Sequence, residues 1–225
     1  MQRGKLMPNV TIENELKLIF TEKDQHSVFW NILRNNYFIQ PHCNRITSDY
    51  YFDYKNFFYD NDITLRIRRG NKVFINYKEP FDVSASLMSR YEYKEFLNIG
   101  QCENISTTMM LDNCFGNRIL ARYFLEEKRK VTITCVLVTK RIVFSIHSKV
   151  QNKIGDRAPI AVTFLDKVYD ENGNFLFEEV EFETIDGYYA PQTYWELDGL
   201  KKQFAEEGIK ESRCSKYQRY IKMQL

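Results

Sequence analysis

Charged and apolar side chains alternate one by one near the N-terminus of the chain. Glu13, Glu15 and Lys17 occupy every second position, and Leu16 and Leu18 lie on the opposite parity. Because successive side chains of a β-strand point to opposite faces, this pattern predicts a strand with one charged and one apolar face. Two carboxylates and an ammonium group therefore lie in a row on one face of that strand.

The same two-faced alternation recurs along the chain, and each further segment that carries it is predicted to be a strand. These segments are 45–54, 62–69, 72–78, 86–96, 124–135, 142–147, 160–168 and 177–183. The dipeptide Asn172-Gly173 is typical of a tight hairpin turn and joins the last two of them. The pattern thus predicts a sheet of about eight strands.

Apolar residues recur with helical spacing in only a few segments. Those between positions 28 and 33 follow residues 21–24, which resemble an N-cap with an acidic residue three positions on. This arrangement predicts a helix of about 14 residues whose apolar stripe can cover a sheet. The segments 193–207 and 216–223 are also predicted to be helical, and 100–115 carries a weaker helical pattern.

Length and composition indicate one globular domain over residues 1–225. No stretch rich in Pro, Gly or Ser divides the chain, and 225 residues are enough for one sizeable core. The net charge of +2 gives no argument for a nucleic-acid partner, so any anion site must come from local clustering of Lys and Arg.

The cysteine spacing and the hydropathy favour a cytoplasmic protein. The five cysteines, at positions 43, 102, 114, 135 and 214, are widely spaced and form no zinc-binding pattern, so we expect reduced thiols. No apolar run approaches the roughly 18 residues of a membrane span, and Met1 is not followed by the apolar core of a signal peptide.

Acidic and basic residues are largely segregated on different predicted strands. The acidic set consists of Glu13, Glu15, Glu92, Glu179, Glu181 and Glu183. The basic set consists of Lys17, Arg66, Arg68, Lys78, Arg90, Lys128 and Lys130. An open sheet with a solvated charged face is the simpler interpretation, but such faces usually mix polar types.

Segregation of this kind favours a sheet that curls into a barrel with its charged faces inward. Six inward carboxylates would repel one another and need cations, for which Mg²⁺ or Mn²⁺ is suitable. The inward bases in turn need an anion, and a linear triphosphate matches them in charge and length. A metal ion that bridges phosphate oxygens is the arrangement that hydrolysis requires.

These residues resemble the motifs of the CYTH superfamily, the triphosphate tunnel metalloenzymes. Glu13-x-Glu15-x-Lys17 is similar to the Glu-x-Glu-x-Lys signature of that superfamily. The other similar motifs, in chain order, are Tyr51-Phe52-Asp53, Leu65-Arg66-x-Arg68, Lys78, Arg90-x-Glu92, Lys128 with Lys130, Leu165-Asp166-x-Val168 and a late Glu-x-Glu. Each motif alone is weak, but their order is fairly specific.

The resemblance implies an α+β fold, an eight-stranded antiparallel β-barrel, or triphosphate tunnel, with helices packed outside. It implies that Glu13, Glu15, Glu181 and Glu183 hold the metal, with Glu179 in reserve because the late glutamate pair can be aligned in two ways. Glu13, Glu15 and Lys17 would be catalytic. Lys17, Arg66, Arg68, Lys78, Arg90, Lys128 and Lys130 would bind phosphates. We expect Glu92 and Asp166 to orient the residues around them, and 136–160 resembles an insertion.

The leading functional hypothesis is a metal-dependent hydrolase that releases phosphate from a triphosphate. Tripolyphosphate, thiamine triphosphate, a nucleoside triphosphate and the 5′ end of an RNA share the part that these residues would bind. One alternative is a class IV adenylate cyclase, in which the ribose 3′-hydroxyl displaces pyrophosphate. The other is a binding module without turnover, against which the full set of carboxylates argues.

Overall fold

The computed structural model describes residues 10–82, 87–97, 131–149, 159–184 and 191–225. The strands are β1 (Val10–Ile19), β2 (Tyr37–Asp53), β3 (Thr64–Arg69), β4 (Val73–Asp82), β5 (Met88–Leu97), β6 (Thr132–Ser148), β7 (Ala161–Asp170), β8 (Phe175–Glu183) and the two-residue β9 (Lys210–Glu211). The helices are α1 (Gln25–Asn36), α2 (Phe57–Asp60), α5 (Pro191–Glu206) and α6 (Lys216–Gln224).

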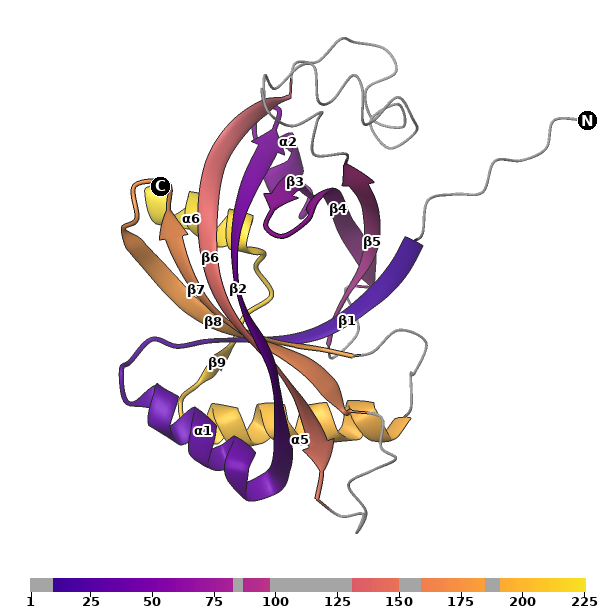
Figure 1. Cartoon of the computed structure of the whole chain (residues 1–225), viewed down its shortest axis with the longest axis vertical. Coiled ribbons are helices and arrows are strands. Elements are labelled where there is room, and N and C mark those ends of the chain that lie inside the picture. The colour runs from indigo at the N-terminus through magenta and orange to yellow at the C-terminus, as the bar shows by residue number, and fades with distance from the viewer. Residues whose placement is uncertain (1–9, 83–86, 98–130, 150–158, 185–190) are drawn as a thin grey trace, which may run out of the picture.

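Eight antiparallel strands close into a ring (Figure 1). Their order is β5-β4-β3-β2-β6-β7-β8-β1, and β1 also pairs with β5, while β9 adds to β1. The ring is uneven, because the 17-residue strands β2 and β6 are much longer than β3, which pairs with β2 only between Ser48 and Phe52 (Figure 1). The α+β class and the antiparallel barrel that the sequence predicted are confirmed.

The apolar faces of the strands point out of the ring and are covered by helices. In the largest core cluster, Phe29 and Leu33 of α1 and Phe204 of α5 pack with Leu16 and Leu18 of β1. A second cluster covers the outer faces of β3 and β4 and includes Phe58 of α2. Since the apolar side chains alternate with the charged ones, this packing leaves the charged faces turned inward.

The strand predicted from 124 to 135 and the one from 142 to 147 are parts of one strand, as far as the described residues show. β6 runs without interruption from Thr132 to Ser148 and pairs with β2 over its whole length. Residues 136–148 are therefore no insertion. The alternation is masked there because both faces are apolar: the inward-facing Leu137 is fully buried in a cluster that α6 completes.

Helix α1 begins at Gln25 and has 12 residues, so the predicted helix was placed too early and made slightly too long. Asp24 occupies the N-cap without a side-chain hydrogen bond. Instead, the side chain of Gln25 accepts hydrogen bonds from the backbone N–H groups of Thr21 and Glu22, at 2.8 and 3.2 Å. Those residues thus form a turn before the helix.

Helix α5 packs through an apolar stripe, as its spacing predicted. Leu197, Leu200 and Phe204 are buried in the main core. Trp195 lies off this stripe, and its side chain is 71% exposed. The predicted helical pattern at 100–115 lies outside the described residues.

Helix α6, at the C-terminal end of the chain, packs against the inner side of the ring. Ser215 and Gln218 form a capping box at its N-terminus. The ring of Tyr217 stacks on that of Tyr51 with centroids 5.4 Å apart, and its hydroxyl donates to Asp53 at 2.7 Å. This docking places Lys216 and Arg219 among the inward-facing side chains of β7 and β8.

Among the described residues, no helix is long and apolar enough to cross a membrane. Three of the cysteines, Cys43, Cys135 and Cys214, are described and carry free thiols. The other two, at positions 102 and 114, lie outside the described residues.

Candidate functional site: a charged cavity inside the ring

The ring encloses a cavity of about 610 Å³ that is lined by charged side chains. Most of the predicted site residues contribute to its wall: Glu13, Glu15, Lys17, Arg66, Arg68, Lys78, Arg90, Glu92, Glu181 and Glu183. Glu179 and Asp166 are fully buried behind this wall. Lys128 and Lys130 lie outside the described residues.

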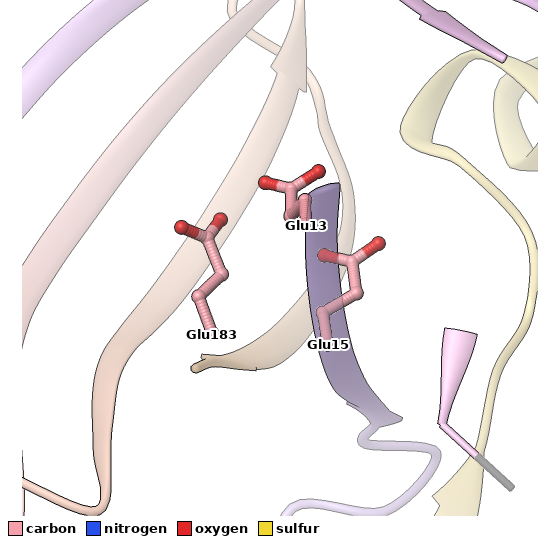
Figure 2. A group of neighbouring side chains, drawn as sticks. All are labelled: Glu13, Glu15 and Glu183. Carbon is pink, nitrogen blue, oxygen red and sulfur yellow. The ribbon is translucent and has the colours of Figure 1, made fainter. Parts of the chain in front are cut away.

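Three glutamates from β1 and β8 converge at one place in the cavity. Each of Glu13, Glu15 and Glu183 offers a carboxylate oxygen, and these oxygens all lie within 4.8 Å of one another (Figure 2). The register explains the convergence, because Glu15 lies directly opposite Glu183 and Glu13 follows on the same face of β1. We call this group the open acidic cluster.

Among the described residues, the open acidic cluster carries more negative charge than its basic neighbours neutralise. Lys78 contacts Glu13, and Lys17 lies 3.3 Å from Glu15. Burial would raise the pKa of Glu13, but Lys78 outweighs it and lowers the pKa to about 2. Burial and the negative charge of Glu13 raise the pKa of Glu183 well above its usual value. An oxygen-only donor set with excess negative charge fits a hard divalent cation such as Mg²⁺ or Mn²⁺.

A second acidic group lies deeper between β7 and β8. Carboxylate oxygens of Asp166, Glu179 and Glu181 also lie within 4.8 Å of one another. Lys216 contacts all three, at 2.9, 2.5 and 2.8 Å. Arg141 forms ion pairs with Asp166 and Glu181. We call this group the neutralised acidic cluster, since its countercharge comes from the chain itself.

The structure therefore divides the predicted metal ligands between two clusters. Glu183 lies with Glu13 and Glu15, whereas Glu179 and Glu181 belong to the neutralised acidic cluster. The stagger of the strands causes this division, because Glu181 lies opposite Lys17.

Two arginines of β3 share one buried carboxylate of β2. Arg68 donates two hydrogen bonds of 2.6 Å to Asp49, and Arg66 donates at 3.4 Å to the same group. Burial would raise the pKa of Asp49, but Arg68 and Arg66 lower it well below its usual range. The sequence reasoning did not select Asp49, although strand alternation places it on the same face as Tyr51 of the Tyr-Phe-Asp motif.

Arg90 and Lys17 line the cavity, and each is held by neighbouring acids. Arg90 is 2% exposed and donates to the backbone carbonyl of Asp62 at 2.7 Å as well as to its carboxylate. Asp62 itself adopts a left-handed backbone conformation, with φ of 54°. Burial would lower the pKa of Lys17, but Glu15 and Glu181 outweigh it and raise the pKa above its usual value. Lys17 is therefore a cation at neutral pH.

The two residues predicted to orient others do make such contacts. Glu92 accepts a hydrogen bond of 2.7 Å from Asn76 and lies 3.7 Å from Lys78. Asp166 accepts two hydrogen bonds from Arg141, at 2.7 and 2.5 Å.

Three basic residues of the site were not selected from the sequence: Arg141, Lys216 and Arg219. Arg141 lies in the part of β6 that was interpreted as an insertion. Lys216 and Arg219 lie on α6, and no local pattern shows that this helix docks inside the ring. The alternation of Thr139, Arg141 and Val143 was the one signal for Arg141, since it places all three on one strand face.

Comparison with known proteins identifies the family. A family model of the CYTH domain matches residues 11–187, which includes all eight strands of the ring. The chain belongs to the CYTH family. The resemblance stated from the motifs is thus confirmed, and the CYTH match ends just beyond Glu183 of the open acidic cluster.

Two solved structures have the same CYTH fold. HpAC1 of Hippeastrum, an adenylyl cyclase candidate with a dominant triphosphatase activity, is 18% identical, with a TM-score of 0.63 over 96% of this chain and 97% of that one. The PH1819 protein of Pyrococcus horikoshii OT3 is 20% identical, with a TM-score of 0.54 over 95% of this chain and 99% of that one. No curated protein sequence matches the chain. At these identities the likeness shows the fold alone.

Proposed function

We propose that this CYTH protein hydrolyses a triphosphate with the help of a divalent metal ion. The observation that carries the proposal is a separation of charge inside one cavity. Three carboxylates with excess negative charge, the open acidic cluster, lie beside a wall of cations that includes the buried Arg66 and Arg90 and the partly buried Lys78. A metal ion satisfies the first group, and a chain of phosphates satisfies the second. The dominant triphosphatase activity of HpAC1 supports the proposal at the level of the family.

Glu13, Glu15 and Glu183 are the residues that would hold the metal ion. A bound Mg²⁺ or Mn²⁺ would supply a Lewis acid that polarises a phosphoryl oxygen. The carboxylates of Glu179 and Glu181 take no part in this proposal, because Lys216 already contacts both.

The basic residues bind and orient the phosphate chain. Arg66, Arg68, Lys78 and Arg90 present donors to the cavity, and a guanidinium can bind two phosphate oxygens at once. Arg66 is suited to this role because its Nε atom is buried and has no hydrogen-bond partner in the described part of the chain. The phosphate-binding roles of Lys128 and Lys130 remain predictions of the motif resemblance.

Lys17 holds the phosphate that is attacked. Its ammonium group lies 3.3 Å from both Glu15 and Glu181, and the raised pKa keeps it protonated. A protonated lysine cannot remove a proton from water, so it acts here as a donor to phosphate oxygens. The proposed catalytic roles are therefore metal binding by Glu13 and Glu15 and phosphate binding by Lys17.

The decisive experiment is a panel of substrates assayed with Mg²⁺ and with Mn²⁺. Tripolyphosphate, thiamine triphosphate, ATP and a 5′-triphosphorylated RNA would be compared by released phosphate. We expect turnover that excess chelator abolishes and either metal restores. Pyrophosphate with cyclic AMP from ATP would instead indicate a cyclase, and binding without any product would indicate a binding module.

The phosphate-binding wall is tested by a pair of arginine variants on β3. Arg66→Ala removes a charge-assisted contact and should weaken tripolyphosphate binding by roughly 10- to 150-fold. Arg69→Ala is the matched control, because Arg69 is exposed and points to the opposite face of the same strand. Equal losses in the two variants, measured by calorimetry on folded protein, would contradict the proposed phosphate site.

A further inference from the structure

One part of the cavity wall is aromatic, and the described residues place no carboxylate in it. Phe74 of β4 lies directly opposite Phe96 of β5, and both line the cavity that also contains Arg66 and Arg68. The two rings meet edge to face, with centroids 6.0 Å apart and planes at 69°. The Phe96 side chain is 64% exposed, so much of its surface is open to a ligand in the cavity.

Two lysines flank these rings. Lys94 Nζ lies 5.0 Å from the centroid of Phe74, and Lys72 Nζ lies 5.4 Å from that of Phe96. Both lysines also line the cavity. The aromatic wall is therefore positively charged as well as apolar, which suits a planar ring that arrives with a phosphate chain attached.

The aromatic wall continues the proposed phosphate site along the strands. On β4, Phe74, Asn76 and Lys78 share the inward face, so Phe74 lies four residues from Lys78, about 13 Å along the strand. Across the sheet, Arg68 lies opposite Phe74, and Arg66 lies opposite Asn76. A triphosphate that reaches from the open acidic cluster along these arginines would have its far end next to the two rings.

We propose that Phe74 and Phe96 form a stacking subsite for a planar ring, so that the substrate is a triphosphate ester of a ring-bearing molecule. This inference rests on the proposed triphosphate hydrolysis. Inorganic tripolyphosphate has no ring and gains nothing from the subsite. ATP and thiamine triphosphate share the required chemistry, since each carries a planar heteroaromatic ring on a triphosphate.

The test compares kcat/KM for ATP, thiamine triphosphate and tripolyphosphate in the wild type and in Phe96→Ala. Loss of one stacked ring should lower kcat/KM for the preferred ester by about 5- to 150-fold. The value for tripolyphosphate should change by less than about twofold, because its contacts remain in place. The ester with the larger loss identifies the ring that the subsite takes.

Phe175→Ala is the matched control. Phe175 is 57% exposed and packs edge to face on Tyr169 with centroids 5.8 Å apart, but it does not line the cavity. This variant should leave all three substrates unchanged, and Phe96→Tyr, which keeps the ring, should retain the ester activity. A loss in Phe96→Ala that is equal for all three substrates, or absent, would overturn the inference while leaving triphosphate hydrolysis intact.

Equilibrium binding keeps the two proposals separable. Dissociation constants for the same three ligands would be measured by calorimetry with Ca²⁺ in place of Mg²⁺. If the wild type turns over none of them but Phe96→Ala weakens ester binding selectively, the subsite stands and the hydrolase proposal fails. If neither binding nor turnover depends on residue 96, the subsite is refuted.

Discussion

The open and the neutralised acidic clusters contain three carboxylates each, but they differ in the source of their countercharge. Lys216 contacts every member of the neutralised acidic cluster, and Arg141 and Arg219 add further ion pairs. Among the described residues, no lysine or arginine forms an ion pair with Glu183 of the open acidic cluster. Close carboxylates are therefore a candidate metal site only where their charge is left uncompensated by the residues around them.

Two glutamates, one from each cluster, have pKa values that shift in opposite directions. Burial would raise the pKa of Glu181, but Lys216 and Lys17 lower it well below its usual value. Burial raises the pKa of Glu15, although Lys17 opposes the change. The raised pKa values of Glu15 and Glu183 mark destabilised anions in the open acidic cluster, whereas Glu181 and the Lys78-bound Glu13 are stable anions.

The largest expected effect is on activity. Glu183→Gln keeps the shape of the side chain but removes the charge of a proposed metal ligand, so kcat/KM should fall by about 1,000-fold or more. Glu178→Gln is the control, because Glu178 points to the outer face of β8 and pairs with His26. Its activity should stay within about threefold of wild type in the same phosphate-release assay. Full activity in Glu183→Gln would show that the open acidic cluster is not the metal site.

The next effect concerns the stability of the neutralised acidic cluster. Lys216→Met leaves three buried carboxylates without their shared cation, which should destabilise the fold by about 3 to 5 kcal/mol, or about 6 to 20 °C in Tm. Lys202→Met, at an exposed ion pair with Asp198, should cost less than about 1 kcal/mol. Thermal melts measure both.

Lys216→Met should also make the neutralised acidic cluster resemble the open acidic cluster. If countercharge is the only difference between them, Ca²⁺ should raise the Tm of Lys216→Met by more than it raises the Tm of the wild type. An equal rise in both proteins would mean that the geometry of the two clusters also differs.

Ligand binding should stabilise the wild type by a smaller amount. Tripolyphosphate with Ca²⁺ at a hundredfold excess over Kd should add about 2.7 kcal/mol, or about 5 to 11 °C in Tm. Glu183→Gln should lose the metal-dependent part of this rise. The melts are run at about 0.15 M salt, where weak binding to a solvated charged face would be screened.

The smallest effect isolates a single neutralised carboxylate outside both clusters. Asp49→Asn should cost about 1.5 kcal/mol at neutral pH, because Arg66 and Arg68 lose an anionic partner but still face the cavity. Since the folded-state pKa of Asp49 is lowered, its contribution is present above the unfolded-state pKa of about 3.9 and is lost as pH falls further. The difference between wild type and variant in denaturant unfolding should therefore shrink in acid; a constant difference would contradict the ion pair.

The sequence by itself determined the two-faced strands, and with them the inner and outer sides of the ring. A period of two is a local property, so alternation sufficed to place Glu13, Arg66 and Lys78 inside and the apolar side chains outside. The order of the motifs sufficed to identify the CYTH family. Alternation could not show that Glu183 belongs to one acidic cluster and Glu179 and Glu181 to the other, because all three share the inward face of β8.

Only the tertiary structure decided which of these glutamates belongs to the candidate metal site. The stagger between β1 and β8 sets Glu15 opposite Glu183, and it is a relation between strands far apart in the sequence. The docking of α6 then brings Lys216 to Glu179 and Glu181. Asp49 and Arg141 were missed for the same reason. The role of each charge depends on a partner from another strand, Arg68 for Asp49 and Asp166 for Arg141. Local periodicity contains no information about such partners.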